Sequence, residues 1–235
     1  MNESSASLPE WAQILAVFDT ETTGIDPATT RIVTANISVI RAGGVIESSR
    51  DWLINPGIEI PAQATNVHGI TTEYAREHGE DAAGAIYDIV AELQALFDSS
   101  IPVVAYNASY DFTILQREAV RYSHDPLSNP SPIIDPLVID KQVDRYRKGK
   151  RTLEAAAAHY GVELTDAHTA AADAQAAGFV AQAIAGKFYK ELDMSAIALH
   201  EKQIEWAAAQ AESFNEYLRK SGKPFSPSSG MWPVR

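Results

Sequence analysis

Residues 17–24 read Val17-Phe18-Asp19-Thr20-Glu21-Thr22-Thr23-Gly24 and continue the apolar run that starts at Ile14. Apolar β-forming residues that give way to carboxylates and then to a Thr/Gly-rich turn predict a buried strand ending at a functional site. Because side chains two positions apart on a strand share one face, Asp19 and Glu21 should point the same way. Carboxylates this close repel each other unless a cation lies between them, and a hard divalent ion is the natural partner. The alternative is a solvated strand end with two unrelated acids.

The following segments predict a mixed α/β fold. Two β-rich runs, Arg31–Ile40 and Val45–Ile54, are separated by the hairpin signal Gly43-Gly44. Three antiparallel strands followed by alternating helices and strands predict one mixed five-stranded sheet with helices on its faces. The later elements are expected as helices over Gly84–Phe97, Asp111–Tyr122, from Leu137, Thr152–Tyr160 and His168–Lys187, and strands over Ile101–Tyr106 and Ile133–Asp135.

Length and composition fit a globular protein with one main domain. Its 235 residues are 46% apolar and 21% charged, which is ordinary for a folded chain. We expect an N-terminal tail over residues 1–12, the main domain over residues 13–187, and a C-terminal helix and tail over residues 188–235. The C-terminal helix is predicted at Ile197–Lys220.

Composition also excludes several classes of function. The net charge of −12 argues against a broad basic surface for nucleic acid, so that metals and local patches would have to hold such a ligand. The lack of cysteine excludes disulfides, thiol nucleophiles and Cys-based zinc sites. We expect a cytoplasmic protein without membrane contact, because neither a signal peptide nor a run of about 18 apolar residues occurs.

A second acid, Asp111, follows the strand predicted at Ile101–Tyr106. Asn107 and Ser109 are residue types that close turns and cap helices, which places Asp111 in a first helical turn. Ligands of open α/β sheets gather beyond the carboxyl ends of strands, so Asp111 is a candidate for the same site as Asp19. Alternatively, Asp111 only complements the helix dipole.

A third polar cluster lies in the alanine-rich segment 166–173. Alanines build a slim helix that can approach a sheet closely while projecting few long side chains. Asp173 would lie near the start of that helix, and His168, five residues earlier, could reach the same cavity. Taken by itself, the histidine could equally be a cap or a surface residue.

The three clusters together resemble the DEDDh family of 3′→5′ exonucleases, over about residues 14–186. Within that family the chain is most similar to the proofreading (epsilon) subunits of bacterial DNA polymerase III. The resemblance implies a ribonuclease H-like fold. The sister family has a catalytic tyrosine where this chain has Thr169, which excludes the tyrosine type. The residues that match the catalytic set are Asp19, Glu21, Asp111 and Asp173 as metal ligands and His168 as the catalytic histidine.

A further segment matches the substrate-binding part of this family. Asn55-Pro56-Gly57 followed by Val67-His68-Gly69-Ile70 resembles its NP…VHGI pattern, in which the histidine and a residue five before it contact the terminal nucleotide. Here these residues are His68 and Gln63, although the most similar relatives carry an acid in place of Gln63. For His68, a turn residue held by Gly69 is the alternative. The substrate-binding residues expected in all are Gln63, His68, Thr20, Glu21 and Thr22 around the 3′ nucleotide, Ile25 between the last bases, and Asn107.

The chemistry implied is hydrolysis with two divalent cations, Mg²⁺ or Mn²⁺, which activate water and stabilise the attacking and leaving oxygens. Asp19 is the candidate bridging ligand because it lies on the central strand. His168 is the expected general base, since an imidazole titrates close to working pH. Asp135 and Asp166 are rival acids, but we expect Asp135 to end a strand and Asp166 to cap a helix.

The segment Lys141–Arg151 is the only dense basic run. Phosphate contacts there would steer a strand without reading its sequence, and the alternative is a solvated loop between helices. Farther on, four aromatic residues could pack the C-terminal helix and tail onto the main domain or onto another chain. These residues are Trp206, Phe214, Tyr217 and Trp232.

The leading hypothesis is a metal-dependent 3′→5′ exonuclease that releases nucleoside monophosphates from single-stranded DNA 3′ ends in proofreading or repair. One alternative is a 3′→5′ exoribonuclease on short RNA, and another is an inactive domain that binds nucleic acid or a polymerase. A DNA polymerase or repair protein is the partner class implied. However, residues 187–235 do not resemble the polymerase-tethering tail of epsilon subunits.

Overall fold

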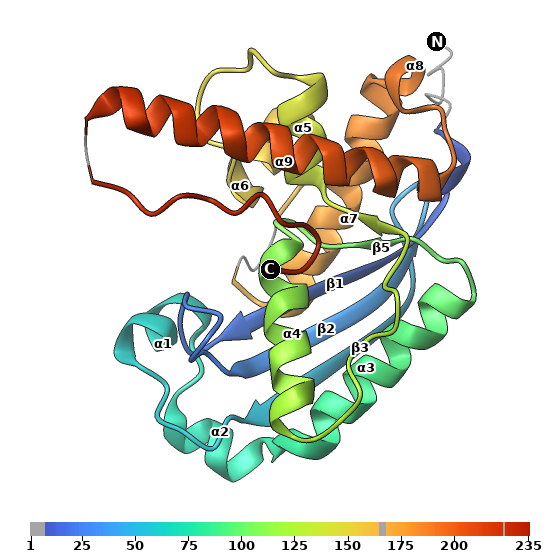
Figure 1. Cartoon of the computed structure of the whole chain (residues 1–235). Coiled ribbons are helices and arrows are strands. Elements are labelled where there is room, and N and C mark those ends of the chain that lie inside the picture. The colour runs from blue at the N-terminus through green and yellow to red at the C-terminus, as the bar shows by residue number, and fades with distance from the viewer. Residues whose placement is uncertain (1–7, 165–167, 223) are drawn as a thin grey trace.

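The computed structural model describes residues 8–164, 168–222 and 224–235. Its centre is a six-stranded sheet of order β4-β3-β2-β1-β5-β6, in which β1 (Ile14–Thr22) is an interior strand (Figure 1). β1 pairs antiparallel with β2 (Ile32–Arg41), and β2 pairs antiparallel with β3 (Val45–Asn55). Gly43 and Gly44 join β2 to β3 with positive φ angles, which glycine adopts without strain. The predicted hairpin is therefore confirmed.

The remaining strands pair in parallel. β5 (Val103–Val104) lies beside β1, β6 (Ile133–Ile134) lies beside β5, and β4 (Glu80–Asp81) lies beside β3. The prediction of five strands missed β4, because two residues are too short to show a periodic pattern. Since β1 and β5 run in the same direction, the segments that follow them lie side by side at the carboxyl end of these two strands.

The helices occupy the segments between and after the strands, and their bounds agree with the predicted ranges to within two residues for the long helices. They are η1 (Glu10–Ala12), α1 (Ala62–His68), α2 (Thr72–His78), α3 (Ala82–Asp98), α4 (Ser109–Arg121), α5 (Pro136–Val143), α6 (Leu153–Tyr160), α7 (Ala170–Lys187), α8 (Tyr189–Leu192) and α9 (Ala196–Ser221).

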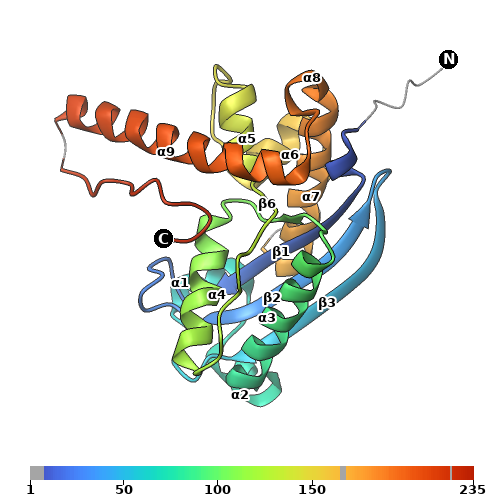
Figure 2. The same ribbon diagram turned by 45° about the vertical axis from the view of Figure 1, so that its right-hand side comes forward.

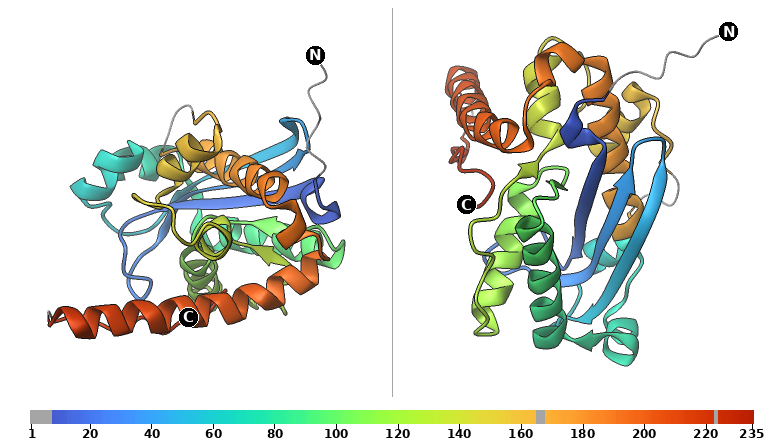
Figure 3. Two further views of the ribbon diagram at one scale, coloured as in Figure 1. Left: turned by 90° about the horizontal axis from the view of Figure 1, so that it is seen from above. Right: turned by 90° about the vertical axis from the view of Figure 1, so that its right-hand side faces the viewer.

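Two hydrophobic layers lie on opposite faces of the sheet. α3 and α4 cover one face, where Phe18 and Phe112 pack together, and α7 covers the other face above Val17 (Figure 3). The predicted slim helix is confirmed: a side chain in place of Gly178 would collide with Val17 and Ile40. Asp19 and Glu21 continue the β1 face that carries Val17, so they point toward α7.

The C-terminal helix α9 closes the open edge of the sheet. His200 Nδ1 accepts the Ile133 N–H at 3.0 Å, and Gln203 accepts the Asp135 N–H at 2.7 Å while donating to the Ile133 carbonyl at 3.0 Å. These contacts satisfy backbone groups of β6 that would otherwise be left unpaired. The tail after α9 then turns back toward α4 (Figure 2). The division of the chain at residue 187 stays a proposal.

The four aromatic residues singled out in the C-terminal segment divide into two groups. Trp206 and Trp232 pack against the hydrophobic core of the main domain, whereas Phe214 and Tyr217 are 54% and 67% exposed. Of the helices described, none is both long and apolar enough to cross a bilayer.

Candidate active site

The first acid pair lies at the end of β1. Asp19 is opposite Asn36 of β2 and Glu21 is opposite Thr34, and the register shifts directly after Glu21. Such a bulge bends a strand and re-aims its last side chains. The two carboxylates therefore lie close together at the carboxyl end of β1.

Asp111 reaches the same end of β1 from the first turn of α4. It is buried, and its Oδ1 accepts the hydroxyl of Thr20 at 2.7 Å and the backbone N–H of Thr20 at 3.2 Å. Thr20 points to the face opposite Asp19, because successive side chains of a strand alternate between its two faces. The threonine thus fixes the carboxylate of α4 to β1, a role that the sequence pattern did not indicate.

The third cluster meets the first at the start of α7. Thr169 caps this helix, which places Asp173 in its first turn. The backbone N–H of His168, a residue with φ of 72°, donates to Asp173 Oδ1 at 3.4 Å. One ligand atom each of Glu21, His168 and Asp173 lie within 4.8 Å of one another. The chain therefore brings together acids and an imidazole that are far apart in sequence.

Burial raises the pKa of all four acids, and repulsion from the other acids of the set raises it further for Asp19 and Glu21. Burial raises the pKa of Asp19 well above its usual range, and the charges of Asp111, Glu21 and Asp173 raise it further. Burial, with Asp173 and Asp111, raises the pKa of Glu21 to about 8, and burial raises the pKa of Asp111 to about 7. Burial likewise raises the pKa of Asp173. No lysine or arginine in the described part of the chain forms an ion pair with any of them.

This donor set fits hard divalent cations. Carboxylate oxygens are the ligands that Mg²⁺ and Mn²⁺ prefer, and a site of four acids without a cationic side chain gains most from such ions. Glu21, His168 and Asp173 each offer one ligand atom to a group that is compact enough to hold such an ion.

A cavity of about 680 Å³ opens beside the acids. Its wall includes the strongly exposed side chains of Ile25, which is 91% exposed, and Val67, which suit the flat apolar face of a base. Every residue predicted to bind the substrate lines this one cavity, namely Thr20, Glu21, Thr22, Ile25, Gln63, His68 and Asn107. Their roles stay predictions.

His68 is oriented by the end of its own helix. Its Nδ1 accepts the N–H of Ile70 at 3.1 Å, so Nε2 carries the proton of the neutral ring. Burial lowers the pKa of His68, an effect that the nearby backbone of Thr22 offsets in part. Nε2 is buried and meets no partner in hydrogen-bond geometry among the described residues. A ligand in the cavity that His68 lines would offer this N–H a better-aligned acceptor than the Thr22 backbone does.

Two residues of the site were missed by sequence reasoning. Tyr110 lines the cavity, and its hydroxyl contacts Thr22 Oγ1 at 2.7 Å and the Gly24 carbonyl, which ties α4 to the turn after β1. Its place directly before Asp111 was the only signal. Glu154, 3.9 Å from His168 Nε2, comes from α6 and no pattern marked it.

Of the two rival acids, Asp135 is fully used by the fold. Its carboxylate accepts the N–H groups of Asn107, Ala108 and Leu137, each at 3.0 Å, and the indole N–H of Trp232 at 3.2 Å. It shapes the turn that leads to Asp111, and it also caps α5. Asp166 lies outside the described residues.

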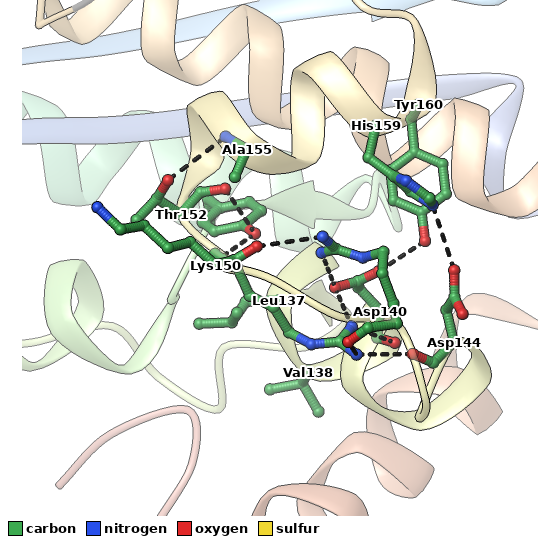
Figure 4. Close-up of polar contacts among 12 residues, drawn as sticks. Leu137, Val138, Asp140, Asp144, Lys150, Thr152, Ala155, His159 and Tyr160 are labelled. Atoms are coloured by element: carbon green, nitrogen blue, oxygen red, sulfur yellow. Dashed lines mark hydrogen bonds and ion pairs between the residues drawn. The ribbon is translucent and has the colours of Figure 1, made fainter.

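The basic run is an internal cluster rather than a free cationic loop. Asp140, which is fully buried, accepts Arg147 at 2.7 Å, Arg151, and the Tyr160 hydroxyl at 2.6 Å (Figure 4). Arg151 also donates to the Asp144 carbonyl at 2.6 Å. Arg147 and Arg151 are therefore paired inside the fold, where their ion pairs with Asp140 hold the loop between α5 and α6. The phosphate contact stays a prediction.

Lys148 and Lys150 remain exposed on this loop. The hydrogen bond with Thr152 lowers the pKa of Glu154, and the nearby charge of Lys150 lowers it further. We expect the double variant Lys148→Gln/Lys150→Gln to lower the magnitude of the slope of log kcat/KM for single-stranded DNA against log salt concentration by about 1.4, since each phosphate contact on a single strand contributes about 0.7. The control is Lys190→Gln/Lys202→Gln, which removes the same charge elsewhere. Equal slopes in both double variants would assign the loop no contact with the strand.

Comparisons with known proteins agree with this geometry. The RNase_T family model, described as exonuclease, matches residues 16–180. The chain is 28% identical over 176 residues to DNA polymerase III PolC-type of Lacticaseibacillus paracasei, an alignment that covers 74% of this chain and 12% of that protein. It is 29% identical over 161 residues to a DNA polymerase III subunit epsilon-like protein of Rhodobacter capsulatus, with 67% of this chain and 21% of that protein covered.

The solved structures give the same fold. E. coli exonuclease I in complex with a dT13 oligonucleotide matches with a TM-score of 0.63 and 20% identity, covering 77% of this chain and 43% of that one. The predicted ribonuclease H-like fold is thereby confirmed. The exonuclease family model extends over more than half of the chain and includes every acid and the histidine of the site, so this chain belongs to the RNase_T exonuclease family.

Proposed function

We propose that the protein is a metal-dependent 3′→5′ exonuclease that releases nucleoside monophosphates from single-stranded DNA ends. The observation that carries this proposal is the convergence of Asp19, Glu21, Asp111 and Asp173 beside a cavity of nucleotide-binding character. A relative named as an epsilon-like polymerase III subunit and a fold shared with an exonuclease bound to dT13 support DNA as the substrate.

The four acids would hold two divalent cations, with Asp19 shared between them. When bound, such cations supply the positive charge that activates water and stabilises the attacking and leaving oxygens of the phosphodiester. The side chains and backbone of the protein would bind and orient the substrate. The backbone of Thr20–Thr22 and the Nε2 of His68 would hold the terminal nucleotide, and Ile25 would separate the last bases.

His168 would take the proton from the attacking water. It lies at the exposed mouth of the acid cluster, and its backbone is tied to Asp173. Glu154 would orient the imidazole, at 3.9 Å from Nε2, and it lies near enough to Asp173 for the two charges to repel each other. A carboxylate behind a catalytic histidine stabilises the charge that develops when the imidazole accepts a proton.

A direct test uses matched 3′-labelled DNA and RNA oligonucleotides with Mg²⁺, with Mn²⁺ and with EDTA. We expect stepwise loss of nucleoside monophosphates from the DNA strand with either ion and none with EDTA. Faster removal from RNA would transfer the proposal to an exoribonuclease, and no product from either strand would leave only a binding module. Association with a DNA polymerase or repair assembly is part of the same proposal.

The raised pKa values predict how cations and pH act on stability. Unfolded acids titrate near pH 4, whereas Glu21 and Asp111 titrate near 8 and 7 in the folded chain. The folded chain therefore holds more protons in this window, so that cation-free stability falls as pH rises toward 8. Mg²⁺ binds the deprotonated acids and should restore it. We expect Mg²⁺ to raise Tm more at pH 8 than at pH 6. Equal gains at both pH values would contradict this.

A further inference from the structure

A second cavity lies next to the first. It has a volume of about 160 Å³ and is enclosed by the turn before α4, by α5, by α9 and by the tail at residues 228–235. Asn107, which is exposed and has φ of 64°, lines both cavities. A strand that leaves the first cavity across Asn107 would therefore enter the second.

The walls of this second cavity are fixed by specific contacts of the tail. Asn215 of α9 exchanges two hydrogen bonds of 2.9 Å with the backbone of Ser228. Gly230 packs so closely on α9 that a Cβ would lie 3.2 Å from the Cα of Ala208. Trp232, only 7% exposed, donates its indole N–H to Asp135. The tail is thus part of the domain surface beside the acid site.

The chemistry of the lining is cationic and aromatic. Lys141 and Arg235 bring positive charge, and Lys141 forms no ion pair with any residue described. Asp135 also lines the cavity; its carboxylate accepts four hydrogen bonds, and its charge stabilises the charged form of Lys141 without a direct ion pair. Phe214 and Met231 line the cavity while more than half exposed. Cations beside an exposed aromatic ring are the combination that binds single-stranded nucleic acid.

We propose that this cavity is a second subsite for the substrate strand, on the 5′ side of the scissile phosphate. Phe214 stacks on a base there, and Lys141 contacts a backbone phosphate. The inference rests on the proposed function, since it extends the path of the same strand. α9 and the tail project on the same side of the molecule as α1, which borders the first cavity (Figures 1 and 2). The subsite lies largely in residues after the matched family segment 16–180.

The test compares a long and a short substrate. On a long oligothymidylate, Phe214→Ala and Lys141→Gln should each raise KM about fivefold to tenfold with little change in kcat, as expected for loss of one stacked base or phosphate contact. Both variants should hydrolyse the p-nitrophenyl ester of thymidine 5′-monophosphate at the wild-type rate, because that ester fills only the first cavity. Wild-type KM values on the long substrate would overturn the proposal.

Matched controls exclude general surface effects. Tyr217 is an exposed aromatic residue three positions after Phe214 on α9 and does not line the cavity, and Lys202 is an exposed lysine of the same helix. Tyr217→Ala and Lys202→Gln should keep the wild-type KM. If Tyr217→Ala raised KM as much as Phe214→Ala, the subsite assignment would be lost.

A binding measurement separates this inference from the proposed function. Fluorescence anisotropy of a labelled oligothymidylate with Ca²⁺ requires no turnover. Weaker binding by Phe214→Ala and Lys141→Gln than by their controls would support the subsite even if the wild-type protein cleaved neither substrate. Unchanged binding by both variants would overturn the subsite and assign this surface to another kind of partner.

Discussion

Replacing Asp19 by alanine is expected to abolish both cation binding and DNA degradation. Asp19 is the acid whose pKa responds to all three of the others, which places it among them. It also lies on an interior strand, β1, which pairs with β2 at Asp19 itself and with β5 two residues earlier. If Asp19 is shared by two cations, as proposed, its removal should lower kcat/KM at least about a thousandfold, or about 4 kcal/mol.

Calorimetric titration with Mn²⁺ measures the binding half of this prediction. A second variant, Asp19→Asn, keeps the shape of the side chain and removes only its charge. Because it relieves repulsion between buried acids, its cation-free Tm should equal or exceed that of the wild type. Asp26→Ala, which alters an exposed acid in the turn after β1, serves as the control. Wild-type heats of Mn²⁺ binding in Asp19→Ala would overturn the role of this residue.

The sequence was most informative where local patterns decide local structure. The period of two along β1 placed Asp19 and Glu21 on one face, and the Gly43-Gly44 turn defined the β2–β3 hairpin. The same period places the side chain of Thr20 on the other face of β1, but only the folded structure shows that it binds Asp111. Residues that converge at the carboxyl ends of neighbouring parallel strands could thus be named before their contacts were known.

Long-range partners could not be predicted in this way. The basic run pointed to a solvated surface or a phosphate-binding loop, because nothing local indicates that Asp140 is buried beneath Arg147 and Arg151. Likewise, the pairing of His200 and Gln203 with the edge of β6 joins segments about 70 residues apart and follows no periodic pattern. Such contacts depend on which surfaces meet after folding.

The position of His168 is compatible with two roles, general base and metal ligand. Its imidazole lies at the exposed mouth of the site, as a general base should, yet it also lies within 4.8 Å of Glu21 and Asp173, as a metal ligand could. A base accepts its proton during turnover and adds nothing to cation affinity. A metal ligand would contribute both to turnover and to cation affinity.

We therefore expect His168→Ala to keep Mn²⁺ binding and the Tm gain from Mg²⁺ while losing about a hundredfold to ten-thousandfold in kcat, the range typical of a general base. Imidazole added to the buffer should restore part of the lost turnover, because it can accept the proton in place of the side chain. His78→Ala, which removes an exposed histidine of α2, is the control and should leave kcat unchanged. If His168→Ala weakened Mn²⁺ binding as strongly as Asp19→Ala and imidazole restored nothing, His168 would be a ligand, and another group would have to take the proton.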